Sequence, residues 1–151
     1  LAKHVAYAAK RMVATDYSEG MIREAQKGKC VDNLIFEVAD ATDLPYENHS
    51  FDVVLIANAL HIMPEPEKAL KEIERVLKED GLLIAPNFVS HQSGIISCLW
   101  SGILRIAGIT FEHQWSGEEY LFWLGQNGWK VQYKKSCPAR ITLMYVECIR
   151  E

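Results

Sequence analysis

Four short apolar runs that end at an aspartate or an asparagine most constrain what this chain can fold into. They are Arg11–Thr15, Leu34–Ala39, Phe51–Ala57 and Leu82–Ala85, and segments of helical composition separate them. Nearly continuous apolar runs are typical of strands that are covered on both faces. Because strands that alternate with helices are joined by right-handed crossovers, the sequence predicts an open, mostly parallel α/β sheet.

Helix signals fill the intervals between these predicted strands. Leu1–Lys10 has helical composition, and Ser18 is a good N-cap for a helix that Gly28 ends. The clearest helix follows Pro64 and is predicted to end at Gly81. One face of this helix is expected to be an apolar stripe of Ala69, Leu70, Ile73, Val76 and Leu77. Two ion pairs are expected on its exposed side, Glu67–Lys71 and Glu74–Lys78.

The last part of the chain departs from this alternation. Ile95–Ala107 is apolar almost all round, which suits a buried or lid-like helix, and Ser116–Glu119 is a capping-box pattern that starts another helix. From Trp129 onward apolar and polar residues alternate, so we expect a strand near the edge of the sheet. Ile141–Ile149 is apolar on both faces and therefore more central, and the short connection predicts that these last two strands pair antiparallel.

Composition limits the classes of protein to which the chain can belong. It has 151 residues, of which 49% are apolar and 24% charged, which is typical of one globular domain spanning residues 1–151. The net charge of −4 without a basic cluster argues against a nucleic-acid partner. The longest apolar stretch, Gly94–Ile109, is too short for a membrane span and Arg105 interrupts it.

The four cysteines do not form a metal-binding pattern. Cys30, Cys98, Cys137 and Cys148 are far apart, with no C-x-x-C pair and no histidine at ligand spacing, so no zinc site or other metal site is predicted. Two disulfides are one interpretation of the even count. We favour reduced thiols in a cytoplasmic protein, because the chain is large enough to fold without disulfides and carries no secretory leader.

Polar residues at the ends of the predicted strands are the candidates for ligand binding, because open α/β sheets bind ligands there. Asp16 is suited to accept hydrogen bonds from both hydroxyls of a ribose, or alternatively to cap the next helix. Asp40 is suited to accept a hydrogen bond from an adenine amino group, and the N–H of Ala41 to donate one to the adenine ring. The alternative is that Asp40 only forms a turn. Asn58 and Asn87 follow the next two strands.

Charge patterning agrees with a site for a cation. Between Val31 and Glu67 the sequence has acidic residues and neither lysine nor arginine. A pocket lined by this segment would carry a negative potential, which favours a cation over a phosphate. A solvated acidic face explains the same pattern.

Several motifs together resemble the class I S-adenosylmethionine-dependent methyltransferases, in the small-molecule branch of the ubiquinone/menaquinone-biosynthesis type. Val13–Met21 is similar to the second-strand motif of that family, and Ala39–Tyr46 followed by Phe51–Val54 is similar to its third-strand and fourth-strand motifs. Ala59–His61 and Ala69–Leu83 continue the match in the same order, and the tail matches more weakly. The resemblance implies a Rossmann-like fold with an antiparallel C-terminal strand pair.

One part of the family pattern is missing. The family begins with a strand and a glycine-rich turn beside the methionine part of the cofactor, whereas no G-x-G precedes Asp16 here. Leu1–Lys10 would correspond to the helix after that turn, so the expectation is an N-terminally truncated domain. A chain that is complete as given would lack the usual central strand of this sheet.

The resemblance assigns roles to particular residues. Asp16 would hold the ribose of S-adenosylmethionine, Tyr17 and Met21 would pack on the adenine, and Asp40 with Ala41 would contact the edge of the base. Asn58 would lie near the methionine part, and His61 is the candidate catalytic base. Tyr17 and Met21 as ordinary core residues, and His61 as a structural hydrogen-bonding residue, are the alternatives. His113 and Trp115 would face the acceptor from the other side.

The implied reaction is direct methyl transfer to a small, lipophilic or aromatic acceptor. Residues 90–115, with the apolar stretch Ile95–Ile109, would cover this substrate, or would simply be a core helix on the sheet. Two other classes stay open: a non-catalytic remnant or partner subunit, which the missing turn favours, and an NAD-dependent oxidoreductase, which also has an acidic residue after its second strand. The sequence does not indicate an oligomeric state.

Overall fold

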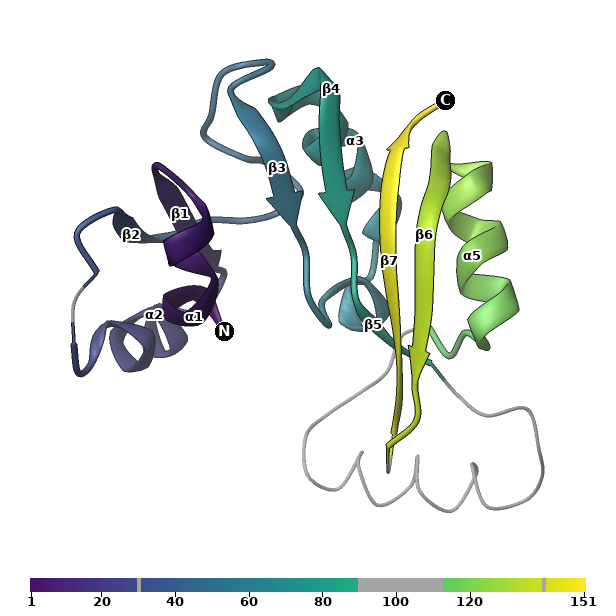
Figure 1. Ribbon diagram of the computed structural model, residues 1–151, viewed down its shortest axis with the longest axis horizontal. Coiled ribbons are helices and arrows are strands. Elements are labelled where there is room, and N and C mark those ends of the chain that lie inside the picture. The colour runs from purple at the N-terminus through teal and green to yellow at the C-terminus, as the bar shows by residue number, and fades with distance from the viewer. Residues whose placement is uncertain (30, 90–112, 140) are drawn as a thin grey trace. The chain divides into compact units, whose positions relative to one another are not determined.

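The computed structural model describes residues 1–29, 31–89, 113–139 and 141–151. These residues form two compact units, Leu1–Pro45 and Tyr46–Glu151, each of which is described by itself (Figure 1). The expectation of one domain over the whole chain stays a prediction. Ile95–Ala107, the predicted lid-like helix, lies outside the described residues.

The first unit is built on two parallel strands. α1 (Ala2–Val5) and the short 3-10 helix η1 (Ala6–Ala8) lead into β1 (Met12–Asp16), and α2 (Glu19–Gln26) connects β1 to β2 (Leu34–Val38). Met12 pairs with Leu34 and Asp16 with Val38, which confirms the predicted parallel arrangement. Ser18 caps α2 as predicted, because its Oγ accepts a hydrogen bond from the N–H of Met21 at 3.4 Å.

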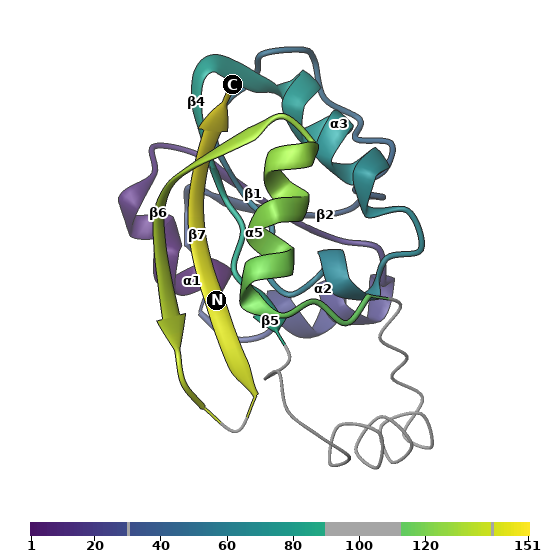
Figure 2. The ribbon, with the colours of Figure 1, turned by 90° about the vertical axis from the view of Figure 1, so that its right-hand side faces the viewer.

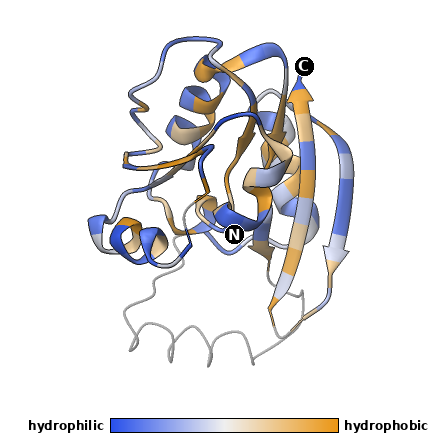
Figure 3. Ribbon diagram, turned by 60° about the vertical axis from the view of Figure 1, so that its left-hand side comes forward, coloured by the Kyte–Doolittle hydropathy of each residue, from blue (hydrophilic) through white to orange (hydrophobic). Residues whose placement is uncertain are grey.

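The second unit is built on a five-stranded mixed sheet. β3 (Phe51–Leu55) and β4 (Leu77–Ile84) are parallel, and the 3-10 helix η2 (Leu60–Ile62) and α3 (Pro66–Val76) connect them. β6 (Trp129–Cys137) and β7 (Thr142–Arg150) are antiparallel, as the short connection predicted. β7 pairs with β6 on one side and with β4 and the short β5 (Asn87–Val89) on the other. It is therefore central, whereas β6 pairs with β7 alone and is largely hydrophilic (Figure 3).

The core of the second unit lies between this sheet and two helices. The predicted stripe of α3, from Ala69 to Val76, is buried, and α5 (Gly117–Gln126) begins with the predicted capping box at Ser116. Figure 2 shows α5 in front of the sheet with α3 beside it. The two helices are in contact, because Nε1 of Trp123 donates a hydrogen bond to Oε1 of Glu67 at 2.9 Å.

The predicted end of α3 is wrong. The helix ends at Val76, and Gly81 lies inside β4, where a β-carbon would come within 2.6 Å of Cγ of Leu77. Glycine is therefore required for close packing inside the strand, and it does not end the helix. The expected ion pair Glu74–Lys78 is wrong for the same reason, because Lys78 is on β4.

The charged side chains of this region have other partners than those expected. Nζ of Lys78 lies 2.6 Å from Oδ1 of Asp52, and Glu67 accepts from Trp123 instead of pairing with Lys71. Asp52 and Glu67 both belong to the acidic segment that begins at Val31. Part of this segment is thus paired within the second unit, so its charge is not all available to a ligand.

Candidate functional site

The carboxyl ends of β1 and β2 bring two predicted site residues to one edge of their sheet. Asp16 is the last residue of β1 and pairs in register with Val38, and its carbonyl oxygen accepts from the N–H of Ala39 at 3.2 Å. Asp40 follows directly. The parallel pairing thus places both carboxylates at neighbouring strand ends, as the sequence predicted.

The two carboxylates are each partly engaged by the local backbone. Oδ1 of Asp16 accepts from the N–H of Ser18 at 2.9 Å, so this side chain does stabilise the turn before α2. Oδ1 of Asp40 accepts from the N–H and the Oγ1 of Thr42, at 2.8 Å and 2.7 Å. These two bonds lower the pKa of Asp40, so it is a carboxylate at neutral pH. In both cases Oδ1 makes the turn, and Oδ2 has no hydrogen-bond partner among the described residues.

Two large apolar side chains close to these carboxylates in the sequence are exposed. Tyr17 is 79% exposed and Met21 is 57% exposed, so neither is an ordinary core residue and that alternative is wrong. Large apolar side chains next to a strand-end carboxylate offer a surface on which a planar base can pack. The N–H of Ala41 donates no backbone hydrogen bond within the described parts of the chain and is suited to contact a ligand.

In the second unit, Asn58 follows β3 in a left-handed conformation, with φ of 52°. Its N–H donates to the carbonyl oxygen of Pro86 at 2.8 Å, which ties the end of β3 to the end of β4. Its Oδ1 is buried and accepts no hydrogen bond from any described residue. A buried carbonyl oxygen without a partner is unusual in a folded protein and marks a position suited to a ligand.

His61 lies in η2, beside Asn58, and is 4% exposed. Its Nδ1 is 2.6 Å from Oδ1 of Asn87, and its ring packs against that of Phe88 in a T-shaped arrangement with 5.9 Å between ring centroids. Burial lowers the pKa of His61, which favours the neutral imidazole. The sequence identified Asn87 as a strand-end residue without a role, and only the fold shows that it contacts His61.

His113 and Trp115 lie next to this group. The N–H of His113 donates to the carbonyl oxygen of His61 at 3.0 Å, and its ring stacks on Trp115 with 4.9 Å between ring centroids. Trp115 in turn stacks on Trp123 of α5 at 4.5 Å. The structure therefore brings His113 to His61, although they are distant in the sequence.

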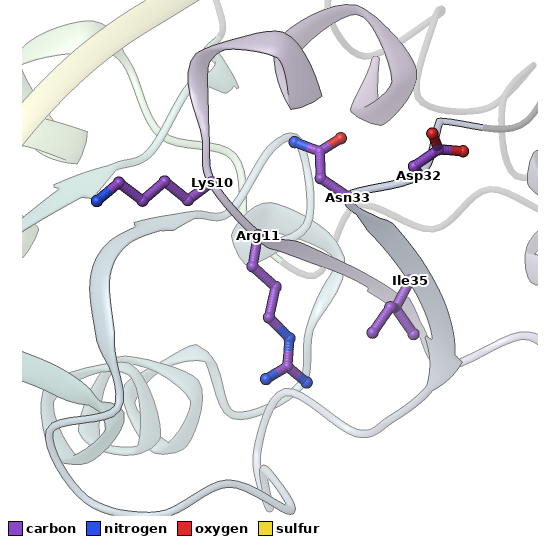
Figure 4. A pocket seen from close by; sticks show the side chains of 5 residues that line it. All are labelled: Lys10, Arg11, Asp32, Asn33 and Ile35. Carbon is purple, nitrogen blue, oxygen red and sulfur yellow. The ribbon is translucent and has the colours of Figure 1, made fainter.

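A separate hollow lies at the other edge of the two-stranded sheet. It has a volume of about 390 Å³ and is lined by Lys10, Arg11, Asp32, Asn33 and Ile35 (Figure 4). These residues lie at or near the amino ends of β1 and β2, so the hollow contains neither Asp16 nor Asp40. Lys10 and Arg11 point in different directions in Figure 4 and do not converge on one ligand.

Two further properties of the described residues bear on the sequence predictions. Cys137 and Cys148 are free thiols, of which Cys148 is buried and Cys137 is half-buried. Burial raises the pKa of Cys148 to about 12, so this thiol is unreactive at neutral pH. In the part of the chain that the structure covers, no helix is long and apolar enough to cross a bilayer.

Comparisons with known proteins agree on one family. A family model described as a methyltransferase domain matches residues 1–85. The demethylmenaquinone methyltransferase of Clavibacter sepedonicus is 42% identical over 78 residues, which are 51% of this chain and 32% of that protein. The ubiquinone/menaquinone biosynthesis C-methyltransferase UbiE of Rickettsia prowazekii is 37% identical over 90 residues, 56% of this chain and 36% of that protein. The chain thus spans about a third of the length of these curated relatives.

Solved structures support the predicted Rossmann-like fold. A SAM-dependent methyltransferase from Methanosarcina mazei superposes with a TM-score of 0.76 at 16% identity, over 100% of this chain and 88% of that chain. At this identity the similarity concerns the fold.

Proposed function

This chain belongs to the methyltransferase-domain family, and we propose that it transfers a methyl group from S-adenosylmethionine to a small, lipophilic acceptor. The observation that carries the proposal is the pair of carboxylates at neighbouring strand ends, Asp16 and Asp40, beside the exposed side chains of Tyr17 and Met21. S-adenosylmethionine supplies an already activated methyl group, so the protein needs mainly to align the acceptor and exclude water.

Each cofactor-binding residue has a proposed contact. Asp16 accepts from the ribose hydroxyls, Asp40 and the N–H of Ala41 contact the edge of the adenine, and Tyr17 and Met21 pack on its face. Oδ2 of each aspartate is suited to these contacts, because Oδ1 already makes the turn. By the family resemblance, Asn58 contacts the methionine part, and its buried Oδ1, which has no partner in the described segments, fits a hydrogen-bond donor.

We propose that His61 is the base that removes a proton from the acceptor. A neutral imidazole is required for this role, and the burial of His61 favours that form. Its position after β3, at the edge where ligands bind in open α/β sheets, is consistent with contact to the acceptor.

The names of the curated relatives narrow the acceptor. One is a demethylmenaquinone methyltransferase and the other a ubiquinone/menaquinone biosynthesis C-methyltransferase. We infer for this chain an acceptor with a hydroxylated aromatic ring, such as a reduced quinone. This agrees with the aromatic side chains of Phe88, Trp115 and Trp123 around the His61 region.

Thermal unfolding of the chain with S-adenosylhomocysteine tests the cofactor site. We expect a saturable rise in melting temperature, because a ligand that binds only the folded state stabilises it. Asp16→Asn and Asp40→Asn should weaken binding by about tenfold or more, since each removes a charged hydrogen-bond acceptor. Asp32→Asn, at the opposite edge of the same sheet, is the matched control and should bind like the wild type.

Other results of these binding measurements would support a different function for the chain. If S-adenosylhomocysteine leaves the melting temperature unchanged, the chain is a non-catalytic remnant or a partner subunit. A rise with NAD and none with S-adenosylhomocysteine would instead indicate an oxidoreductase. Equal weakening by all three variants would mean that the carboxylates act only through general charge.

A further inference from the structure

Asn87 is a buried polar side chain that neither the sequence motifs nor the proposed function uses. It is the first residue of β5, follows Ala85 and Pro86 after the end of β4, and is 1% exposed. Its backbone pairs with Met144 of β7, so its side chain is held in place by the centre of the sheet. Within the described residues, its Oδ1 lies 2.6 Å from Nδ1 of His61.

This contact determines which nitrogen of His61 carries the proton. An amide oxygen only accepts hydrogen bonds, so Nδ1 must be the donor and must be protonated. In a neutral imidazole the other nitrogen, Nε2, then has the lone pair. Asn87 thus selects the tautomer in which Nε2 can accept a proton.

The amide nitrogen of Asn87 has no hydrogen-bond partner in the part of the chain that the structure describes. Nδ2 is buried and donates to no described residue, and the same is true of Nε2 of His113, whose backbone N–H donates to the carbonyl oxygen of His61. Buried polar atoms are almost always hydrogen-bonded. Both atoms belong to residues that contact His61, so each is suited to a polar group of a ligand.

We propose that Asn87 positions His61 and also recognises the acceptor. In this proposal Nδ2 of Asn87 donates a hydrogen bond to a hydroxyl group of the acceptor. This inference rests on the proposed function and extends it to a residue and a chemical group. A hydroxyl suits the site because its oxygen accepts a hydrogen bond from Nδ2 of Asn87 while its proton is donated to Nε2 of His61. When the acceptor gains the methyl group, S-adenosylmethionine leaves as uncharged S-adenosylhomocysteine, and Nε2 of His61 takes the one proton that the acceptor loses.

The tautomer of His61 tests the positioning role directly. In ¹⁵N-labelled wild-type chain, long-range ¹H–¹⁵N correlation spectra should show Nδ1 of His61 protonated and Nε2 unprotonated, with His61→Gln used for the assignment. If Nε2 is the protonated nitrogen, the Asn87 amide has the opposite orientation and the proposal is overturned. This measurement needs neither cofactor nor substrate, so it is independent of the proposed function.

Two substitutions of Asn87 separate its two roles. Asn87→Asp keeps an oxygen that accepts from Nδ1 but removes the Nδ2 donor, whereas Asn87→Leu removes both groups. We expect Asn87→Asp to retain the wild-type tautomer with a raised pKa of His61, because a negative charge stabilises the imidazolium. Asn87→Leu should lose the preference for protonated Nδ1. If Asn87→Leu does not fold, Asn87→Ser, which also shortens the side chain, replaces it.

Recognition is tested with naphthohydroquinone, kept reduced, and with its dimethyl ether, which cannot donate a proton. By titration calorimetry with S-adenosylhomocysteine present, the wild type should bind the hydroquinone, and Asn87→Asp should bind it about tenfold or more weakly. The dimethyl ether should bind the wild type weakly. His49→Gln is the control, because His49 contacts the carbonyl oxygen of Leu77 at the opposite end of the sheet.

The outcomes distinguish failure of this inference from failure of the proposed function. If S-adenosylhomocysteine does not bind, the proposed function is refuted. The positioning role of Asn87 is then still decided by the tautomer of His61. Two outcomes with normal cofactor binding overturn the recognition role. One is equal affinity of the wild type and Asn87→Asp for the hydroquinone, and the other is no binding of the hydroquinone at all.

Discussion

At the scale of single residues, Tyr120 shows how one buried polar group joins two layers of the second unit. It is 0% exposed, and its hydroxyl donates to the carbonyl oxygen of Ala85 at 2.9 Å. Ala85 follows β4, and its own N–H donates to the carbonyl oxygen of Val146 on β7. Tyr120 therefore fixes α5 to the end of β4, close to Asn87.

We expect Tyr120→Phe to lower the free energy of unfolding by about 1 to 2 kcal/mol, because the carbonyl oxygen of Ala85 loses its buried donor. Urea denaturation followed by circular dichroism measures the change. Tyr133→Phe is the control; this residue is 49% exposed, so the change should stay within about 0.5 kcal/mol. Equal losses in the two variants would contradict the importance of the buried bond.

His61 should make the stability of the chain depend on pH. Burial lowers its pKa in the folded chain below the ordinary value of about 6.5, so below that value the unfolded chain binds a proton that the folded chain does not. The free energy of unfolding should therefore fall as the pH decreases from about 7 to 5. His61→Gln should show a smaller fall in the same denaturation experiment, and an unchanged slope would refute this contribution.

At the scale of elements, the start of α5 depends on reciprocal hydrogen bonds. Oγ of Ser116 accepts from the N–H of Glu119 at 3.3 Å, and Oε2 of Glu119 accepts from the N–H of Ser116 at 2.8 Å. These bonds favour the charged form of Glu119 and so lower its pKa. The cap was evident in the sequence because both of its members lie within four consecutive residues.

Ser116→Ala should destabilise the second unit by about 1 kcal/mol, the usual effect of losing an N-cap. Glu118→Gln, in the same first turn but outside the capping box, should change stability by less than about 0.5 kcal/mol. Thermal unfolding of both variants measures the difference. A Ser116→Ala chain as stable as Glu118→Gln would show that α5 is held by packing alone.

The boundary between α3 and β4 shows where such local signals fail. The apolar stripe of α3 was correctly predicted, since it repeats with helical spacing and faces the core. The glycine at position 81 was interpreted as a helix end, but its neighbours decide otherwise, because the side chain of Leu77 occupies the space where a β-carbon would be. That contact exists only after Leu77 has entered the strand beside Phe51.

At the scale of the whole molecule, the two units differ in how much core they contain. Among the described residues, the buried apolar residues of the first unit are Ala6 and Ile22, while all the others belong to the second unit. A two-stranded sheet with so little buried surface is marginally stable by itself.

We therefore expect amide hydrogen exchange to be faster in β1 and β2 than in β4 and β7, because protection follows local stability. Mass spectrometry of the exchanging chain resolves these segments. S-adenosylhomocysteine should slow exchange in β1, β2 and α2, where Asp16, Met21 and Asp40 lie. Equal protection of the two units without ligand would contradict the difference in core, and a ligand effect confined to the second unit would contradict the proposed cofactor contacts.

The sequence by itself determined the order of the longer strands and helices, the strand-end positions of Asp16 and Asp40, and the family resemblance, but it did not predict the short strand β5. These depend on residues that are adjacent or repeat with a fixed period, so hydrophobic spacing and capping chemistry are sufficient to identify them. Only the tertiary structure decided that Tyr17 and Met21 are exposed, that Gly81 lies in a strand and that Asn87 holds His61. His61 and Asn87 are 26 residues apart, and such polar contacts form only when long-range sheet pairing has brought the strand ends together.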